Sequence, residues 1–406
     1  MTGRPAPAPL LTGGQSLFFD ACRGISAQLV LIGHALNVTF PAVFMLATPT
    51  GGLAARAGLP YMQNLGVLVF FLISGFLVTG SALRRALDPA WGMPDFLADR
   101  FARIFTPLVP ALLIICVVDQ IMVANAGPSR ISDLNSGPAD LIVNILMLSG
   151  NPGMVVLARA TGLDWLASGA FGSADQLWTV MIEWWIYVVF ALGFFAAAAR
   201  RRFGAIGWAI AAGLLAVGLA TLAGAATHAP GLLLAWAMGM LACIGRVRLA
   251  RIPAALLAGV ALATLLAALG LLAGNGWAFY AVPSALSLGV AFFATCFALA
   301  RGSAQASGHA AAGAPSALRR TIAHLSNVSY SLYLVHLSLI VWADMMLGVD
   351  FAGPLAFGLM LLLANLAAWL FYLAFERHYH AVRRRMQPLV RRIAGILTPS
   401  QGAIAP

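Results

Sequence analysis

Apolar segments about 20 residues long recur along the whole chain, and they constrain its fold more than any other feature. Hydrophobic residues make up 61% of the 406, charged residues only 9%, and the mean hydropathy is +0.90. A helix needs about 20 apolar residues to cross the ~30 Å hydrocarbon core of a bilayer. The pattern therefore predicts an all-α integral membrane protein with about ten transmembrane helices. We place these at residues 17–37, 61–80, 102–123, 176–199, 203–224, 229–245, 253–273, 278–300, 325–347 and 353–376.

Positive charge is distributed unevenly among the predicted loops. All 24 basic residues are arginine. With the N-terminus inside, ten spans place all but three of them in cytoplasmic loops or at their edges; the exceptions are Arg56, Arg130 and Arg159. Such an asymmetry follows the positive-inside rule and predicts that both termini are cytoplasmic. The formal net charge of +11 is then a consequence of topology, and no nucleic-acid partner is expected.

The sequence predicts a single membrane domain with two short flanks. Residues 1–16 form a disordered N-terminal tail, residues 17–376 the transmembrane domain, and residues 377–406 a basic cytoplasmic tail suited to an anionic lipid surface. The longest loop, 124–175, lies outside, and a loop of this length is usually functional or disordered. Within it, the apolar stretch 139–150 is too short to span and predicts a re-entrant or interfacial helix.

Two ionisable residues, Arg23 and His34, lie inside the first apolar segment. Ionisable groups at membrane depth cost about 2.5–3.5 kcal/mol or more each and mark functional interiors. Their separation of eleven residues is close to three helical turns, which places both side chains on one face, roughly 16 Å apart. Asp20 precedes Arg23 by three residues and can pair with it. Taken singly, Arg23 also suits snorkelling at the interface, and His34 an interhelical hydrogen bond.

Two other apolar segments carry polar residues that are candidates for the same interior. Glu183 is one of only two glutamates, and its aromatic and aliphatic neighbours require it to be paired or protonated. Tyr187 follows one turn later on the same face. Ser74, beside Gly75, indicates either a binding position or close packing between helices.

Arginine pairs and aromatic residues near the segment ends complete the candidate set. Arg100 and Arg103 share one helix face at the cytoplasmic mouth, where they either bind phosphate groups or only serve the charge asymmetry. In the ninth segment Tyr333 accompanies His336, which either lines a cavity or hydrogen-bonds a neighbouring helix. Trp165 and the aspartates of the long outer loop suit the apolar face and the hydroxyls of a sugar. The four cysteines show no metal-ligand spacing, and no metal site is expected.

Five stretches together resemble the acyltransferase-3 family of membrane O-acyltransferases. The first holds Asp20, Arg23, Gly24 and Gly33-His34 in the places of the family's arginine–ten–histidine element. Four further blocks follow in the family's order: FFLISGF, RFARIFTPLVP, LWTVMIEWWIY and SYSLYLVH. The resemblance extends over about residues 17–376, which is essentially the whole predicted membrane domain.

The resemblance implies ten spans in a bacterial cytoplasmic (inner) membrane and an acyl-transfer activity. The implied donor is a cytoplasmic acyl-CoA, usually acetyl-CoA, and the implied acceptor is an extracytoplasmic hydroxyl, commonly on a glycan or a lipid-linked oligosaccharide. By position, His34 matches the catalytic histidine and Glu183 the acid. The donor would be held by Arg23, Arg100, Arg103 and Ser74. Substrate binding or support is assigned to Asp20, Tyr187, Tyr333, His336 and Trp165.

Three departures from the family pattern change what is expected. Trp184 stands where many members carry a second acid, so a role shared by two carboxylates is absent. The family's acid–x–proline ending is here Glu376-Arg377-His378, which removes the basis for a special role of Glu376. We expect no hydrolase-like outer domain after the last span, so the acceptor would reach the membrane domain directly.

Two other classes of function fit parts of the pattern. A proton-coupled secondary transporter would use His34, Glu183 and His336 as a relay, but the sequence shows no inverted repeat and no paired broken helices. A lipid-binding scaffold would neither bind nor hydrolyse acyl-CoA. Stabilisation by CoA distinguishes the acyltransferase from the transporter. The sequence thus favours a membrane O-acyltransferase that transfers an acetyl, succinyl or longer acyl group.

The arginine asymmetry gives a test of topology. In a variant without the native cysteines, single cysteines replace Ser132, in the predicted outer loop, and Ser303, in a predicted cytoplasmic loop. An impermeant thiol reagent added to intact cells is expected to label position 132 and to spare position 303. Equal labelling of the two positions would contradict the ten-span topology.

Overall fold

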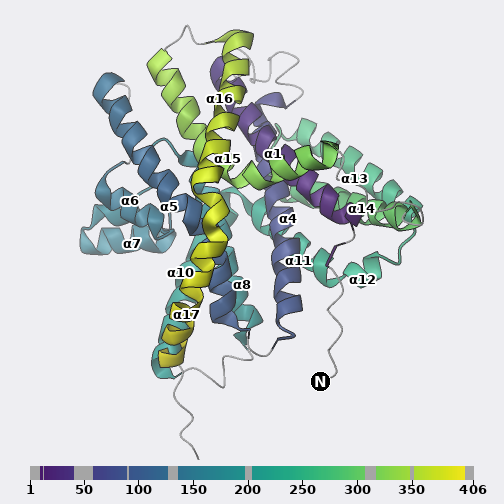
Figure 1. Ribbon diagram of the computed structural model, residues 1–406, viewed down its shortest axis with the longest axis horizontal. Coiled ribbons are helices and arrows are strands. Elements are labelled where there is room, and N and C mark those ends of the chain that lie inside the picture. Colours follow the sequence, from purple (N-terminus) through teal and green to yellow (C-terminus); the bar gives the residue numbers. More distant parts are fainter. Residues whose placement is uncertain are drawn as a thin grey trace, which may run out of the picture. The chain divides into compact units, whose positions relative to one another are not determined.

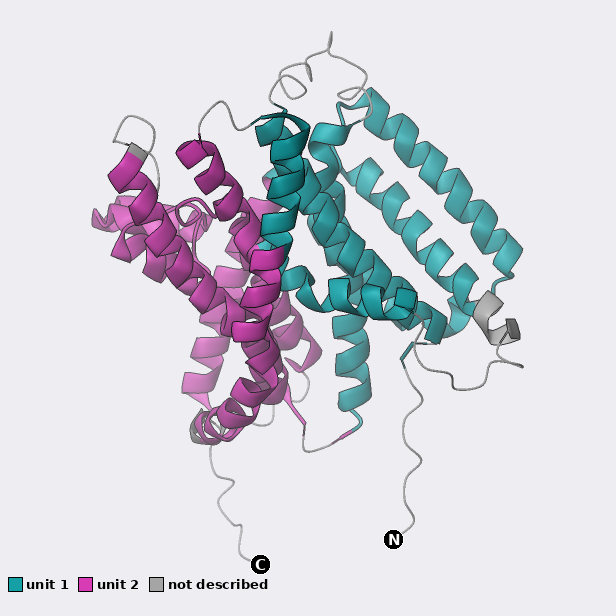
Figure 2. Cartoon of the chain, turned by 45° about the horizontal axis from the view of Figure 1, so that its top comes forward, with its two compact units in different colours: residues 1–87, 228–333, 350–365 teal, residues 88–227, 334–349, 366–406 magenta. Residues whose placement is uncertain are grey.

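The computed structural model describes eight ranges of the chain: residues 10–11, 13–40, 58–88, 91–126, 136–196, 204–306, 317–347 and 352–397. Within these ranges the regular secondary structure is entirely helical (Figure 1). The chain forms two compact units, each built from discontinuous segments (Figure 2). Unit 1 comprises residues 1–87, 228–333 and 350–365, and unit 2 comprises residues 88–227, 334–349 and 366–406.

Nine helices of the described residues are long and apolar enough to cross a membrane. They are α1 (Gly13–Thr39), α4 (Met62–Arg85), α5 (Met93–Ala126), α8 (Trp178–Phe194), α10 (Ala205–His228), α13 (Ala254–Gly274), α14 (Val282–Ala306), α15 (Ala317–Leu347) and α16 (Gly353–Ala374). Each occupies a predicted span, which confirms the all-α membrane fold. Helix α1 begins four residues before the predicted span, inside the predicted tail 1–16; residues 1–9 and 12 lie outside the described residues.

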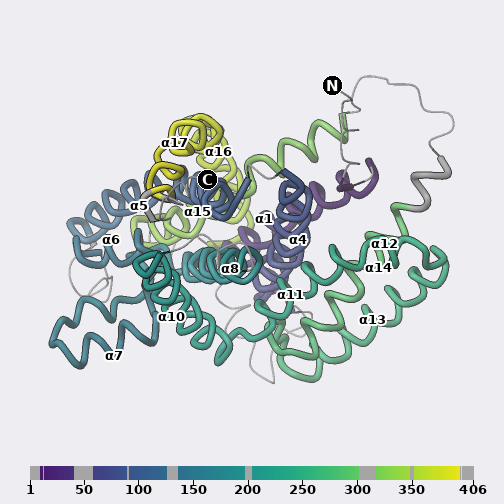
Figure 3. Tube along the Cα trace, turned by 90° about the horizontal axis from the view of Figure 1, so that it is seen from below, coloured from purple at the N-terminus to yellow at the C-terminus, as the bar shows by residue number. Residues whose placement is uncertain are grey.

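The sixth predicted span, residues 229–245, is a shorter helix. Helix α11 (Pro230–Ile244) has 15 residues and a length of about 22 Å, below the ~30 Å of a hydrocarbon core. It packs against α4 and α14 in unit 1 (Figure 3). Both of its ends have protein partners: Gly231 N donates to Tyr280 O over 2.8 Å, and Arg246 Nη1 donates to Cys243 O over 3.1 Å. Terminal backbone groups that cannot reach water need such partners.

Two glycines set the distance between α4 and α11. A Cβ atom added to Gly75 would overlap the carbonyl oxygen of Trp236 and lie 2.9 Å from its carbonyl carbon. A Cβ atom added to Gly239 would lie 2.7 Å from the backbone nitrogen of Phe76. The helices therefore touch backbone to backbone, as helices packed through small residues do in membranes. The Ser74-Gly75 pair thus serves close packing through its glycine.

Helices α4 and α11 run in the same direction. Gly58, just before α4, lies against Trp277, and the start of α11 is hydrogen-bonded to Tyr280 in the same connection between α13 and α14. At the other end, Arg84 of α4 acts electrostatically on Cys243 of α11. The predicted second and sixth spans both run inward, so the parallel arrangement agrees with the predicted topology.

In unit 2, helix α17 (Tyr379–Leu397) packs against the first half of α5. Asp95 Oδ1 accepts hydrogen bonds from Gln387 Nε2 over 2.9 Å and from Arg391 Nε over 2.8 Å. One helical turn later along α5, Asp99 forms an ion pair with Arg383. The pairing order makes the two helices antiparallel. Much of the predicted basic tail 377–406 is therefore a docked helix, while residues 398–406 lie outside the described residues.

The described part of the loop predicted to lie outside, residues 124–175, contains short helices. Helix α6 (Pro138–Ile145) covers part of the predicted apolar stretch 139–150, and α7 (Pro152–Thr161) follows it. Asp119 of α5 accepts hydrogen bonds from Ser173 N over 3.0 Å and from Ser173 Oγ over 2.6 Å, which ties the end of this loop to α5. The loop thus rests on the helices of unit 2, and its residues 127–135 lie outside the described residues.

The contact between α4 and α11 predicts a sharp effect of one methyl group. Gly75→Ala is expected to lower the stability by about 1–3 kcal/mol, because a methyl group must displace the backbone of α11. Thermal unfolding in mild detergent measures the loss. Gly270→Ala is the control: Gly270 lies in α13 with no atom near the new Cβ, so this variant should unfold no earlier than the parent. Equal midpoints of thermal unfolding for the two variants would contradict the tight contact between α4 and α11.

Candidate functional site

Arg23 is held on α1 by a carboxylate and a hydroxyl. Its Nη1 lies 4.0 Å from Asp20 Oδ1 and donates a 3.3 Å hydrogen bond to Ser326 Oγ on α15. Ser326 Oγ in turn donates to Asp20 Oδ1 over 3.0 Å. The Arg23 side chain is 26% exposed, and Ser326 is buried. The triad fixes the guanidinium while leaving part of it accessible, and it confirms that Asp20 and Arg23 lie together.

A glycine next to Arg23 makes this triad possible. A Cβ atom on Gly24 would lie 2.8 Å from Leu325 Cβ and 3.3 Å from the backbone nitrogen of Ser326. Only glycine lets α15 approach α1 this closely at unchanged backbone positions. The Arg23-Gly24 dipeptide therefore places Ser326 within hydrogen-bonding reach of Arg23.

His34 lies on the same helix beside a second close approach. Helix α1 is unbroken from Gly13 to Thr39, so His34 shares a face with Arg23 roughly 16 Å away. The residue before it, Gly33, lies against α4: an added Cβ atom would overlap Gln63 Oε1 and lie 2.8 Å from Gln63 N. His34 is half-buried. Packing of α4 against Gly33 thus fixes the backbone that carries the imidazole.

Unit 2 contains a second cluster of predicted site residues. Tyr187 OH donates a 2.5 Å hydrogen bond to Glu183 Oε1, one turn apart on α8. The Arg100 guanidinium carbon of α5 lies 5.8 Å from the centres of the Tyr187 and Phe96 rings. A cation over an aromatic face is attracted by the ring quadrupole. Arg100, Tyr187 and Glu183 therefore form one connected cluster, in which Tyr187 lies between the cation and the acid.

Arg103 has a different partner from Arg100, although the two share a helix face. Its Nη2 lies 3.3 Å from Glu376 Oε1, and its guanidinium carbon lies 4.8 Å from the ring centre of Tyr379. Glu376 is fully buried and Arg103 is 33% exposed. A buried carboxylate requires such compensation. Arg103 thus has a structural role at the junction of α16 and α17, in addition to the anion-binding role expected for it.

The remaining predicted residues are distributed over both units. Ser74 is half-buried on α4, and Tyr333 is buried, with its ring edge-on to Phe70 at 6.1 Å. His336 is fully buried on α15. Trp165 lies in the outer loop with 43% of its surface exposed and in neither cluster.

Two polar contacts of α1 were not predicted from the sequence. One is Ser326 in the Arg23 triad. The other is a reciprocal amide pair with α16, in which Gln28 Nε2 donates to Asn365 Oδ1 over 2.7 Å and Asn365 Nδ2 donates to Gln28 Oε1 over 3.1 Å. A signal existed for both, because serines and single amides inside apolar segments commonly pair across helices.

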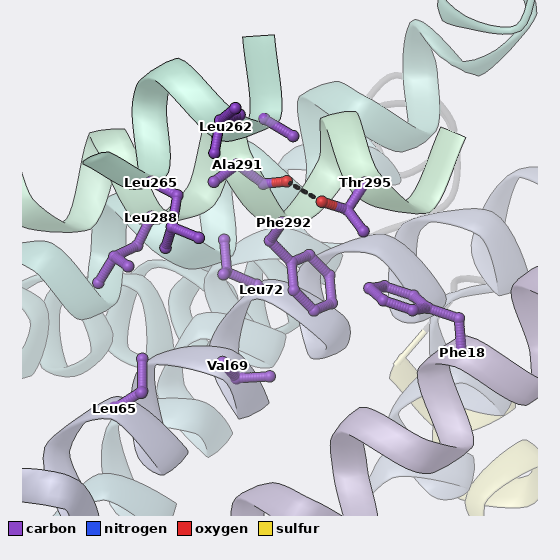
Figure 4. A pocket seen from close by; sticks show the side chains of 11 residues that line it. Phe18, Leu65, Val69, Leu72, Leu262, Leu265, Leu288, Ala291, Phe292 and Thr295 are labelled. Atoms are coloured by element: carbon purple, nitrogen blue, oxygen red, sulfur yellow. Dashed lines mark hydrogen bonds between the residues drawn. The ribbon is translucent and has the colours of Figure 1, made fainter. Parts of the chain in front are cut away.

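Unit 1 also contains an apolar cavity of about 380 Å³ lined by α1, α4, α13 and α14 (Figure 4). Its lining includes Phe18, Leu72, Leu265 and Phe292 and holds no ionisable side chain. The hydroxyl of Thr295 already donates to Ala291 O over 2.9 Å. The cavity offers hydrophobic contact only, and none of the predicted site residues lines it.

The candidate residues of unit 1, Arg23 and His34, and the cluster of unit 2 offer complementary chemistry. Each contains a fixed arginine that can bind an anion through several N–H donors. Unit 1 adds an imidazole, which can serve as a general base or as a nucleophile. Unit 2 adds a carboxylate that is hydrogen-bonded to a phenol. Arginine remains protonated and is a poor base, so the imidazole of His34 and the carboxylates of Asp20 and Glu183 are the candidate proton acceptors.

Comparison with known proteins identifies one family. The acyltransferase-3 family model, described as an acyltransferase domain, matches residues 16–373. No curated protein and no solved structure matches the chain.

The Arg103–Glu376 contact gives a stability prediction. Arg103→Ala leaves a carboxylate buried without its guanidinium and is expected to cost about 2–3 kcal/mol, below the typical ~3–5 kcal/mol because Arg103 is partly exposed. Adding Glu376→Gln should recover part of the loss. Thermal unfolding of both single variants and the double variant measures this coupling. Additive losses would mean that the ion pair contributes nothing.

Proposed function

Because the chain belongs to the acyltransferase-3 family, we propose that this membrane acyltransferase takes its acyl group from cytoplasmic acyl-CoA, in the simplest case acetyl-CoA. The proposed acceptor is a hydroxyl group of an extracytoplasmic or lipid-linked glycan. The proposed product is an O-acyl ester in the bacterial cytoplasmic membrane or outside it. The observation that carries the proposal is the arrangement of α1, where a fixed cation and a titratable base share one face.

The proposed donor site uses the arginines. Acyl-CoA carries several phosphate charges, and Arg23 and Arg100 each hold a guanidinium, a group with five N–H donors, in a position defined by its contacts. Arg103 contributes through nitrogens that do not face Glu376. Ser74 lies on α4, which packs against α1. The thioester, at the end of a long flexible arm, would extend into the bundle toward His34.

Neutral His34 is the proposed catalytic base. Its imidazole accepts the proton of the acceptor hydroxyl, the oxygen attacks the thioester carbonyl, and the carbon–sulfur bond breaks. The departing CoA thiolate then takes up the proton from His34, so that charge and protons balance. In a second route the imidazole attacks the thioester carbonyl and displaces the CoA thiolate, which gives an acyl-histidine; the acceptor hydroxyl then attacks this acyl group, releasing the imidazole, and its proton passes to the thiolate. Glu183, which accepts a hydrogen bond from Tyr187, is the proposed hydrogen-bonding group for the sugar.

The outer loop is the proposed contact surface for the acceptor. Trp165 is exposed and can stack on the apolar face of a sugar, while Asp164 and Asp175 are exposed carboxylates that can accept hydrogen bonds from hydroxyl groups. Asp140 does not belong to this set, because its two oxygens already accept hydrogen bonds from Gly137 N and Ser168 Oγ. The attachment of the loop to Asp119 supports a defined surface.

His34 provides the decisive test of the proposed activity. His34→Ala is expected to lower acyl transfer by about 10²–10⁴-fold if the residue is a base, and to abolish it if the residue is a nucleophile. His34→Asn should fail equally, because an amide cannot accept the proton. Surface-glycan acylation, measured by mass spectrometry in cells that carry only the variant, reports the activity.

The controls separate catalysis from folding and from the rival functions. His324→Ala removes an exposed histidine at the start of α15 and should leave transfer unchanged. CoA should raise the unfolding temperature of the parent and of His34→Ala alike, whereas Arg23→Ala should weaken this response. Near-normal acylation by His34→Ala would refute the catalytic assignment. No stabilisation of the parent by CoA would favour a transporter or a lipid-binding scaffold.

A further inference from the structure

Helix α17 has two faces with different environments. Its side chains at every fourth position, Arg383, Gln387 and Arg391, contact Asp95 and Asp99 of α5. Residues spaced four apart lie along one face of a helix. This docking face fixes the rotation of α17 and therefore determines which side chains point away from α5.

The opposite side of α17 combines arginines with apolar side chains. Arg384, Arg385 and Arg392 are exposed, and so are Leu389, at 58%, and Ile393, at 49%. Around the helix, residues 385, 389, 392 and 393 lie about 120° or more from Gln387, the middle of the docking face, and Arg384 lies about 60° from it. We call these five residues the outward face of α17. An exposed pair of aliphatic side chains flanked by guanidinium groups is typical of helices that contact a bilayer interface.

The outward face has an uncompensated positive charge. Residues 377–406 contain no acidic side chain. Among the described residues, the ion pairs of α17 with α5 use Arg383 and Arg391, both on the docking face. The arginines of the outward face are therefore available to an anion from outside the protein.

The chain path places the outward face near the end of a membrane span. The turn Glu376–His378 directly follows α16, and α17 begins at the next residue. In the predicted topology this end of α16 is cytoplasmic, the side on which anionic lipids create a negative surface potential. Arg377, in the turn itself, is also exposed.

We propose that the outward face of α17 binds the headgroups of anionic phospholipids. Arg384 and Arg385 would contact the lipid phosphates, and Leu389 and Ile393 would contact the upper part of the acyl chains. The charge of the surface, its aliphatic side chains and its nearness to a span all fit this partner. Because α17 is already folded against α5, no ordering of the helix is needed for binding. This site is independent of the proposed acyl transfer.

The experiment measures which lipids stay bound to the full-length protein. The protein is reconstituted into vesicles of equal parts phosphatidylglycerol and phosphatidylcholine, extracted in mild detergent, and its retained lipids are quantified by mass spectrometry. The parent should be enriched in phosphatidylglycerol. Arg384→Gln with Arg385→Gln should lower this enrichment about tenfold or more, since each basic residue near a surface contributes substantially to attraction. Replacing both by lysine should preserve it.

Matched variants and a competitor decide the outcome. Arg248→Gln with Arg251→Gln removes two exposed arginines of unit 1, in and just after the short helix α12 (Arg246–Leu249), and should leave the enrichment intact. Equal losses in the two double variants would overturn the proposal, because the effect would then be one of overall charge. Displacement of the lipid by free CoA or inorganic phosphate would also overturn it, because the face would then bind soluble anions rather than a bilayer lipid.

Discussion

Direct contact between helix backbones at glycine is the constraint on which the rest of unit 1 depends. Gly75 and Gly239 bring α4 and α11 together, Gly33 brings α4 to α1, and Gly24 brings α15 to α1. In a membrane, helices gain little from hydrophobic exclusion, so close van der Waals contact and interhelical hydrogen bonds must supply the association. The same contacts fix the candidate functional side chains, because Arg23 and His34 are each adjacent to one of these glycines. Packing and chemistry are thus encoded by the same dipeptides.

Buried charge follows a consistent rule in unit 2. Each acid of the α5–α17 contact has an arginine partner, and the fully buried Glu376 has Arg103. Removing one partner of a buried ion pair destabilises a protein far more than replacing both partners by apolar residues. Arginine suits these positions, since its planar fork can bind a carboxylate and an aromatic ring together, as Arg103 does with Glu376 and Tyr379. The proposed phosphate recognition and the internal ion pairs therefore depend on the same residue type.

The sequence predicted the helices well and their partners only in part. Length and apolar composition predict ten spans, of which nine are helices long enough to cross a membrane, because the bilayer imposes both properties on any helix that crosses it. The Asp20–Arg23 and Glu183–Tyr187 contacts were predictable, since each lies within one helix turn. The partners Ser326 and Glu376 were not, because they are distant in sequence and helix–helix geometry selects them. The docking of α17 was missed because its arginines equally suit a solvated tail.

The short helix α11 has hydrogen-bond partners within unit 1 at both of its ends. Its 15 residues cover about 22 Å, roughly 8 Å less than a hydrocarbon core, and its ends are hydrogen-bonded by Tyr280 and Arg246. Longer neighbours, α4 and α14, flank it, so surrounding lipid need not thin to match it. The length of α11 is therefore matched to its protein partners rather than to the thickness of the bilayer. A change in bilayer thickness should accordingly act on its longer neighbours before it acts on α11.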